Sequence, residues 1–233
     1  MKYEIKITLA SYKIIYSMLF MLIIILVRPI SSYSEIISVL ESSVALLAGV
    51  FMADNYYKEY INERISTFYL FPDRKKYCAL LKRTIISLVY LIILTALFYW
   101  GFALMYHPTN YSGVSLQGLY FQCVIACALS MMVMGVFCFT VTNLTRNIGI
   151  GIGVLFLLWL FLTSSLTDRL PPAMQLFKLS GEVIQEGYLI PYWQSRILYA
   201  LMGVLLMIVN IHLVREQPDC NKKGWRKYGN KSQ

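Results

Sequence analysis

The sequence predicts an all-α membrane protein, and three observations lead to this prediction. Of the 233 residues, 58% are hydrophobic and only 14% are charged, whereas about a quarter of the residues in soluble domains are charged. The apolar residues gather into six runs, each near the roughly 20 residues that a helix needs to cross a bilayer core. These runs are continuously apolar and do not alternate with polar residues, which favours helices over β-barrel strands.

We expect one transmembrane domain over residues 1–233, with six spans and both termini in the cytoplasm. The expected spans are residues 14–31, 36–53, 84–106, 118–142, 148–166 and 193–214. Arg28 and Pro29 follow the first apolar stretch directly where a signal peptide would carry a small-x-small cleavage site, so an uncleaved anchor is expected. In this topology 17 basic residues lie inside and 4 outside, as the positive-inside rule requires.

The first two spans each carry a charge close to the turn that joins them. At a rise of 1.5 Å per residue, Arg28 and Glu41 lie roughly 6 to 9 Å below residues 32–35, on antiparallel neighbours. A charge at that depth is costly unless it is paired or faces water. We expect a structural ion pair between them or a substrate pathway; alternatively, Pro29 ends the span early and Arg28 snorkels to the interface.

A charged cytoplasmic segment, residues 54–83, joins the second and third spans and holds 11 of the 33 charged residues. Apolar residues recur in it at helical spacing with polar residues opposite, so residues 54–70 are predicted to form an amphipathic helix parallel to the membrane. Pro72 should end this helix, because the residue before a proline avoids the α conformation. The alternative is a solvated loop whose lysines only set topology, but an apolar stripe backed by acidic residues favours a docking element.

The fifth span follows a tight turn at residues 143–147 and opens with three glycines. Gly149 and Gly153 fit a small-xxx-small packing face, either within the subunit or across a dimer. A phosphate-binding loop is excluded, because no Lys-Ser or Lys-Thr pair follows and no strand precedes the glycines.

Two further segments complete the expected arrangement. The outer connection, residues 167–192, mixes large apolar and charged residues, which predicts one or two short amphipathic helices that bury against the spans as a lid. The basic cytoplasmic tail, residues 215–233, suits anionic lipid headgroups better than nucleic acid.

The sequence contains no arrangement of residues that predicts catalysis. Neither His107 nor His212 stands in an HExxH motif or beside a visible nucleophile, which argues against hydrolase chemistry. No CxxC motif or Cys and His cluster marks a metal site. We therefore expect a non-enzymatic membrane subunit with no metal and no cofactor of its own.

The segment between the second and third spans contains a local pattern: Glu63-Arg64-Ile65-Ser66-Thr67, then Leu70-Phe71-Pro72-Asp73-Arg74, then Lys82. Together with six spans and cytoplasmic termini, this pattern resembles the ABC-2 permeases, the membrane subunits of type 2 ABC exporters. That family has an acidic residue, Gly-Thr, Leu, Pro-x-Arg and Lys in this order, and Ser66 stands where the family often has glycine.

The resemblance implies a coupling helix in this segment and short helices between the fifth and sixth spans. It also implies that a separate ABC ATPase subunit binds the ATP and Mg²⁺, since the chain has no Walker A motif. A second permease subunit, identical or different, is expected to complete the pathway. The residues expected to contact the ATPase are Glu59, Glu63, Arg64, Pro72, Asp73 and Arg74.

The expected function is that of a permease subunit in a bacterial cell membrane that moves an amphiphile, such as a peptide, a lipid-linked molecule or a drug. Export of antimicrobial peptides, or immunity to them, is a family-level analogy. The alternative is a non-transporting membrane sensor, immunity or scaffold protein that binds a cytoplasmic partner through residues 54–83. Membrane lipid is an expected partner and nucleic acid is not.

Overall fold

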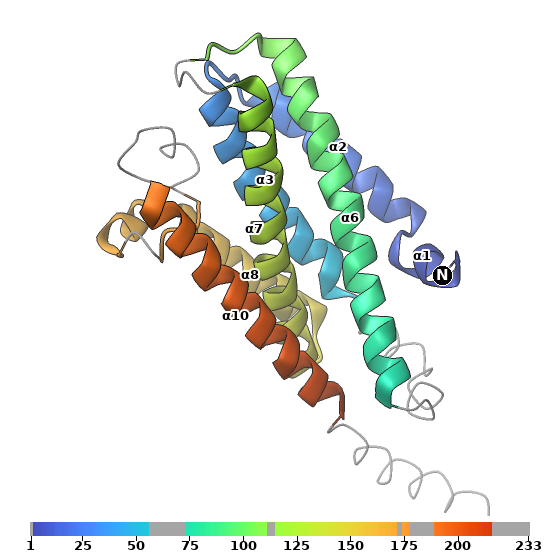
Figure 1. Cartoon of the computed structure of the whole chain (residues 1–233). Helices are drawn as coiled ribbons and strands as arrows, with labels where there is room; N and C mark the ends of the chain where they lie inside the picture. The colour runs from blue at the N-terminus through green and yellow to red at the C-terminus, as the bar shows by residue number, and fades with distance from the viewer. Residues whose placement is uncertain (1, 56–72, 111–114, 172–173, 178–188, 216–233) are drawn as a thin grey trace, which may run out of the picture.

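A computed structural model describes residues 2–55, 73–110, 115–171, 174–177 and 189–215 (Figure 1). Over these residues the chain is helical, apart from short connections and one isolated β-bridge between Ser32 and Thr109. The predicted all-α class is thereby confirmed. The elements in chain order are α1 (Lys2–Thr8), α2 (Ser11–Val27), α3 (Tyr33–Ala53), α6 (Asp73–Tyr106), α7 (Leu116–Thr145), α8 (Ile148–Thr163), the 3₁₀ helix η1 (Ser165–Arg169) and α10 (Leu189–Arg215).

Two helices, α3 and α7, pack along each other and form the centre of the bundle (Figure 1). Of an apolar stretch of 18 residues in α3, 72% is buried, against 17% of the corresponding stretch in α10. α3 therefore lies inside the bundle and α10 at its periphery. One apolar core joins α2 and α6 to this central pair. A second core joins α8 and residues 176–177 to it.

The peripheral helices turn large apolar side chains outward. Leu104 of α6 is 71% exposed and Leu157 of α8 is 66% exposed, and many similar residues surround them. An apolar surface of this extent does not suit a monomer in water. Because a bilayer is the solvent that accommodates it, the chain is a membrane-embedded protein.

Four helical segments among the described residues are long and apolar enough to cross a membrane: Tyr33–Ala53, Lys75–Tyr106, Leu116–Thr145 and Gln194–Leu213. The other two expected spans correspond to α2 and α8, which have 17 and 16 residues. At 1.5 Å per residue these reach only about 24 to 26 Å, less than the roughly 30 Å of a hydrocarbon core. The six-span topology therefore stays a prediction.

The helices begin and end where local residues dictate, and these positions differ from the ends of the apolar runs. α2 ends at Val27 because Arg28, which precedes Pro29, is in an extended conformation with φ −112° and ψ 97°. α6 already begins at Asp73, so residues 73–83 extend the third expected span as a helix. The predicted amphipathic helix at residues 54–70 lies almost wholly outside the described residues, as does the basic tail beyond Arg215.

The tight turn predicted at residues 143–147 is present but shorter, because α7 continues to Thr145. Arg146 takes a left-handed conformation with φ 53° and stops α7. Asn147 then caps α8, because its side-chain oxygen accepts hydrogen bonds from the N–H groups of Gly149 and Ile150. The two helices are consequently antiparallel neighbours in contact with each other.

Candidate functional site

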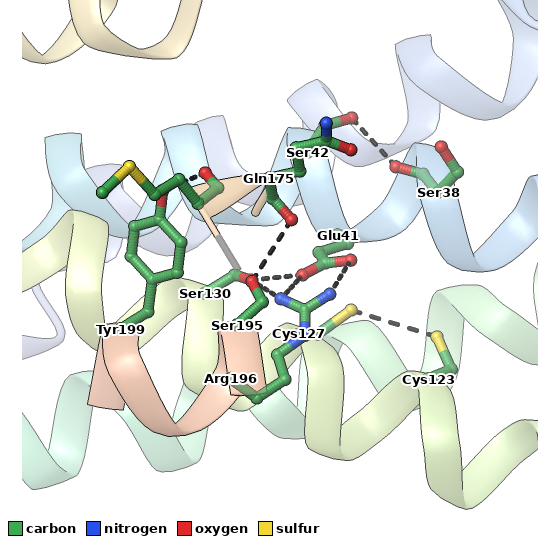
Figure 2. A network of polar contacts seen from close by, with 11 residues as sticks. Ser38, Glu41, Ser42, Cys123, Cys127, Ser130, Gln175, Ser195, Arg196 and Tyr199 are labelled. Atoms are coloured by element: carbon green, nitrogen blue, oxygen red, sulfur yellow. Dashed lines mark hydrogen bonds and ion pairs between the residues drawn. The ribbon is translucent and has the colours of Figure 1, made fainter. Parts of the chain in front are cut away.

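A buried ion pair lies inside the bundle where α3, α7 and α10 meet (Figure 2). Glu41 of α3 is fully buried and Arg196 of α10 is 1% exposed. The Arg196 guanidinium donates to both carboxylate oxygens of Glu41, with Nη2 at 3.0 Å from Oε2 and Nη1 bonded to Oε1. Nη1 also donates to the Ser130 hydroxyl of α7 at 3.0 Å, and that hydroxyl donates to Glu41 Oε1.

This network holds the helices that carry it together through charged hydrogen bonds. A two-pronged arginine–carboxylate contact is among the strongest polar interactions in proteins, because both partners are ionised and their geometries match. Inside an apolar bundle each charge alone would be very costly, and the pair offsets that cost only while both members are present. The pair therefore holds α10 to α3 across α7.

The structure gives Glu41 a different partner from the predicted one. Arg28 is exposed and extended just beyond the end of α2, which agrees with the part of the alternative in which Pro29 ends the helix early; the placement of Arg28 at the membrane interface stays a prediction. Arg196 is one of the four basic residues that the expected topology places outside. A signal was present in the sequence, because Arg196 stands three residues into the sixth apolar run, near the depth expected for Glu41.

Polar contacts around this pair fix part of the outer connection onto α10. The Ser195 hydroxyl donates to the backbone oxygen of Gln175 at 3.2 Å, and the Tyr199 hydroxyl donates to that of Met174 at 2.6 Å. Leu176 and Phe177 are buried as a result. The predicted burial of the outer connection against the spans is confirmed for these residues, while residues 178–188 lie outside the described part.

One thiol of α7, that of Cys127, lies close to the pair, and a second, that of Cys123, lies beyond it (Figure 2). Cys123 and Cys127 are buried one helical turn apart, with their Sγ atoms 3.9 Å from each other (Figure 2). Within the described ranges, no three His, Cys, Asp or Glu side chains gather in a way that could hold a metal ion.

A second group of charges ties the start of segment 54–83 to α2. The Lys13 side chain is 2% exposed; its Nζ pairs with Asp54 Oδ1 and donates to the backbone oxygen of Phe51 at 2.7 Å. The Tyr12 hydroxyl donates to Asp54 Oδ2 at 3.3 Å. The residue at which the charged segment begins is thus held by α2.

The other end of the segment is held in the same way. Arg83 of α6 is almost fully buried; its Nε donates to Glu4 Oε2 of α1 at 2.8 Å and its Nη1 to the backbone oxygen of Asn55 at 2.9 Å. One guanidinium therefore connects α1 with both ends of the segment. Of the residues expected to contact an ATPase, Asp73 and Arg74 lie in the first turn of α6.

The remaining four residues of that expected contact lie outside the described residues; they are Glu59, Glu63, Arg64 and Pro72.

The glycines of α8 do not pack as predicted within the chain. Gly153 is exposed, and a Cβ built on it would meet nothing within 4 Å; one on Gly149 would meet only Asn147 Oδ1, at 3.2 Å. The close approach is made by Gly151, where a Cβ would stand 2.0 Å from Thr142 Oγ1. Of the two alternatives for Gly149 and Gly153, only packing across a dimer is left as a prediction.

No family model, curated protein or solved structure matches this chain.

Proposed function

We propose that this chain is the permease subunit of an ATP-driven exporter of the ABC-2 type in a bacterial cell membrane. A separate ATPase subunit binds the ATP and Mg²⁺ and docks on residues 54–83. The shorter helices α2 and α8 complete six spans, and a second permease subunit, the same or different, completes the pathway. The cargo is an amphiphile such as a peptide, a lipid-linked molecule or a drug.

The observation that carries this proposal is the closure of segment 54–83 at both ends by ion pairs. Asp54 is fixed to Lys13 of α2, and Arg83 is fixed to Glu4 of α1 and to Asn55. A segment that only set topology would need no such attachment. Because of it, a force applied to the segment by a soluble partner moves α1, α2, α3 and α6 together, as rigid-body coupling requires.

The buried pair of Glu41 and Arg196 extends this coupling to the far side of the bundle. It links α3, whose last residues adjoin the charged segment, to α10. A displacement of α3 is thus passed to α10 through a bidentate contact. ATP binding then shifts the bundle between two arrangements by its differential affinity for them.

The test is co-purification followed by measurement of ATP hydrolysis. The chain, extracted from its native membrane, is expected to retain an ABC ATPase. The charge reversals Glu63→Lys and Arg74→Glu should weaken that association at least about tenfold, because like charges at an interface are strongly unfavourable. Lys178→Glu, on the opposite side of the membrane in the proposed topology, is the matched control and should retain the ATPase.

Complexes that contain no ATPase would overturn the transport proposal. If a different soluble protein co-purified and the same two reversals released it, the chain would be the non-transporting sensor, immunity or scaffold protein of the alternative. Thermal unfolding of each variant in detergent checks that the helical bundle is intact.

A further inference from the structure

A cavity of about 480 Å³ lies between α7, α8 and α10. Its inner wall includes Val133 and Met134 of α7 and Leu162 of α8, all nearly or fully buried. The hydroxyl of Tyr199, which also lines it, is already used in the hydrogen bond to the Met174 backbone. The side chains around the cavity thus offer an apolar ligand extensive contact and leave a polar one without specific partners.

The cavity exists because α8 and α10 both pack on α7 but make little contact with each other. Its outer wall consists of Phe161, Leu198 and Met202, which are 44%, 43% and 39% exposed. These three side chains belong to the apolar surface that faces the bilayer. The cavity therefore adjoins lipid on its outer side.

Size and chemistry together restrict what can fill this space. An apolar cavity of about 150 Å³ already stays dry and takes up benzene, because water finds no hydrogen-bonding partners there. Ligand pockets in proteins usually measure about 300 to 1,000 Å³. The cavity thus has room for an elongated apolar group, and its lining offers water no hydrogen-bonding partners. The bilayer beside it contains such apolar groups at high concentration.

We propose that this cavity binds one acyl chain of a membrane lipid, which enters sideways between α8 and α10. Leu170 and Met174 line it as well, so one end lies at the connection that follows η1, and the lipid headgroup remains in the interface there. This site requires neither an ATPase nor a cargo and is independent of the proposed function.

Photo-crosslinking in defined vesicles tests the proposal. The purified full chain is placed in vesicles of phosphatidylethanolamine and phosphatidylglycerol that contain a phospholipid with a diazirine in one acyl chain, and labelled peptides are mapped by mass spectrometry. Labelling is expected to concentrate on cavity residues such as Met134 and Leu162, which ordinary bilayer contact does not reach.

Met202→Trp places an indole at the opening and should lower cavity labelling about tenfold, the loss expected for about two buried methylene groups. Leu198→Trp, one turn earlier, should act in the same way. The matched control is Leu205→Trp, because Leu205 is 62% exposed on α10 and does not line the cavity; this variant should label as the wild type does.

Labelling spread evenly over the lipid-facing residues, or unchanged in both opening variants, would overturn the proposal. Cavity labelling by a diazirine-bearing peptide but not by the lipid probe would also overturn it and would assign the space to cargo. The vesicles contain neither ATPase nor ATP, so failure of the exporter proposal leaves this result unaffected.

Discussion

Glu41 is buried inside an apolar bundle, and each of its carboxylate oxygens accepts a hydrogen bond. The Arg196 guanidinium donates one hydrogen bond to each oxygen, and the Ser130 hydroxyl donates a third. The pair is neutral as a whole, whereas either member alone would be a bare charge in a medium of low polarity. Removing one partner should therefore cost more than removing both.

We expect Glu41→Leu or Arg196→Met alone to lower the free energy of unfolding by about 3 to 5 kcal/mol, since each leaves an uncompensated buried charge. The double variant should lose much less, because apolar side chains of similar volume replace the pair. Denaturant titration of the detergent-solubilised protein measures all three. A double variant that loses the sum of the two single losses would show that the residues are not coupled.

Glu41→Gln separates a structural role of this residue from a direct one. Under the exporter proposal, if the pair only holds the helices together, any loss of ATP-driven transport should follow the loss of assembly across variants. A variant that assembles normally but transports with altered specificity would instead place Glu41 on the pathway.

α8 has one close-packed face and one open face, and its glycines distinguish them. Gly151 lies against Thr142 of α7, and Gly153 points into open space. A methyl group at the first position would clash with the Thr142 side chain of α7, whereas at the second it meets no protein atom of the described chain. The same substitution should therefore have opposite effects two residues apart.

Gly151→Ala is expected to cost about 1 to 3 kcal/mol of stability, the usual penalty for overpacking. Gly153→Ala should be neutral or stabilising by up to about 1 kcal/mol, because alanine favours the helix. Thermal unfolding in detergent compares the two variants. Equal losses would contradict the packing described for α8.

The whole molecule has two chemically different ends. At one end, ion pairs of Lys13 with Asp54 and of Arg83 with Glu4 hold the first and last residues of the charged segment. At the other, Ser31 and Thr109 join the α2–α3 and α6–α7 connections by backbone hydrogen bonds. We expect the end with the ion pairs to face the cytoplasm, since it is rich in lysine and arginine.

Cys78 provides a direct test of this orientation. It is exposed in α6 near the charged end, while Cys123, Cys127 and Cys138 are buried. In a Cys220→Ser background, a membrane-impermeant maleimide should label the chain in inside-out vesicles and leave it unlabelled in intact cells. Moving the thiol with Cys78→Ser and Gln117→Cys, to an exposed position at the opposite end, should reverse the pattern; labelling of Cys78 in intact cells would refute the orientation.

The sequence by itself determined the class of this protein, because a bilayer favours long, continuous apolar runs and these can be read locally from the sequence. It also located the connection between α7 and α8, although α7 continues to Thr145. The first span was expected to reach residue 31, and the end of α2 before Pro29 was only the alternative. The start of α6 at Asp73 was missed, because a helix can continue past the apolar run into charged residues.

Only the tertiary structure decided which buried charges meet. The sequence indicated that Glu41 needs a partner and favoured Arg28, because hydropathy carries no information on which helices are neighbours. Because α3 and α10 both pack on α7, Arg196 meets Glu41 from 155 residues away. The same packing left the cavity between α8 and α10, since a void depends on how helices meet and not on the composition of any one of them.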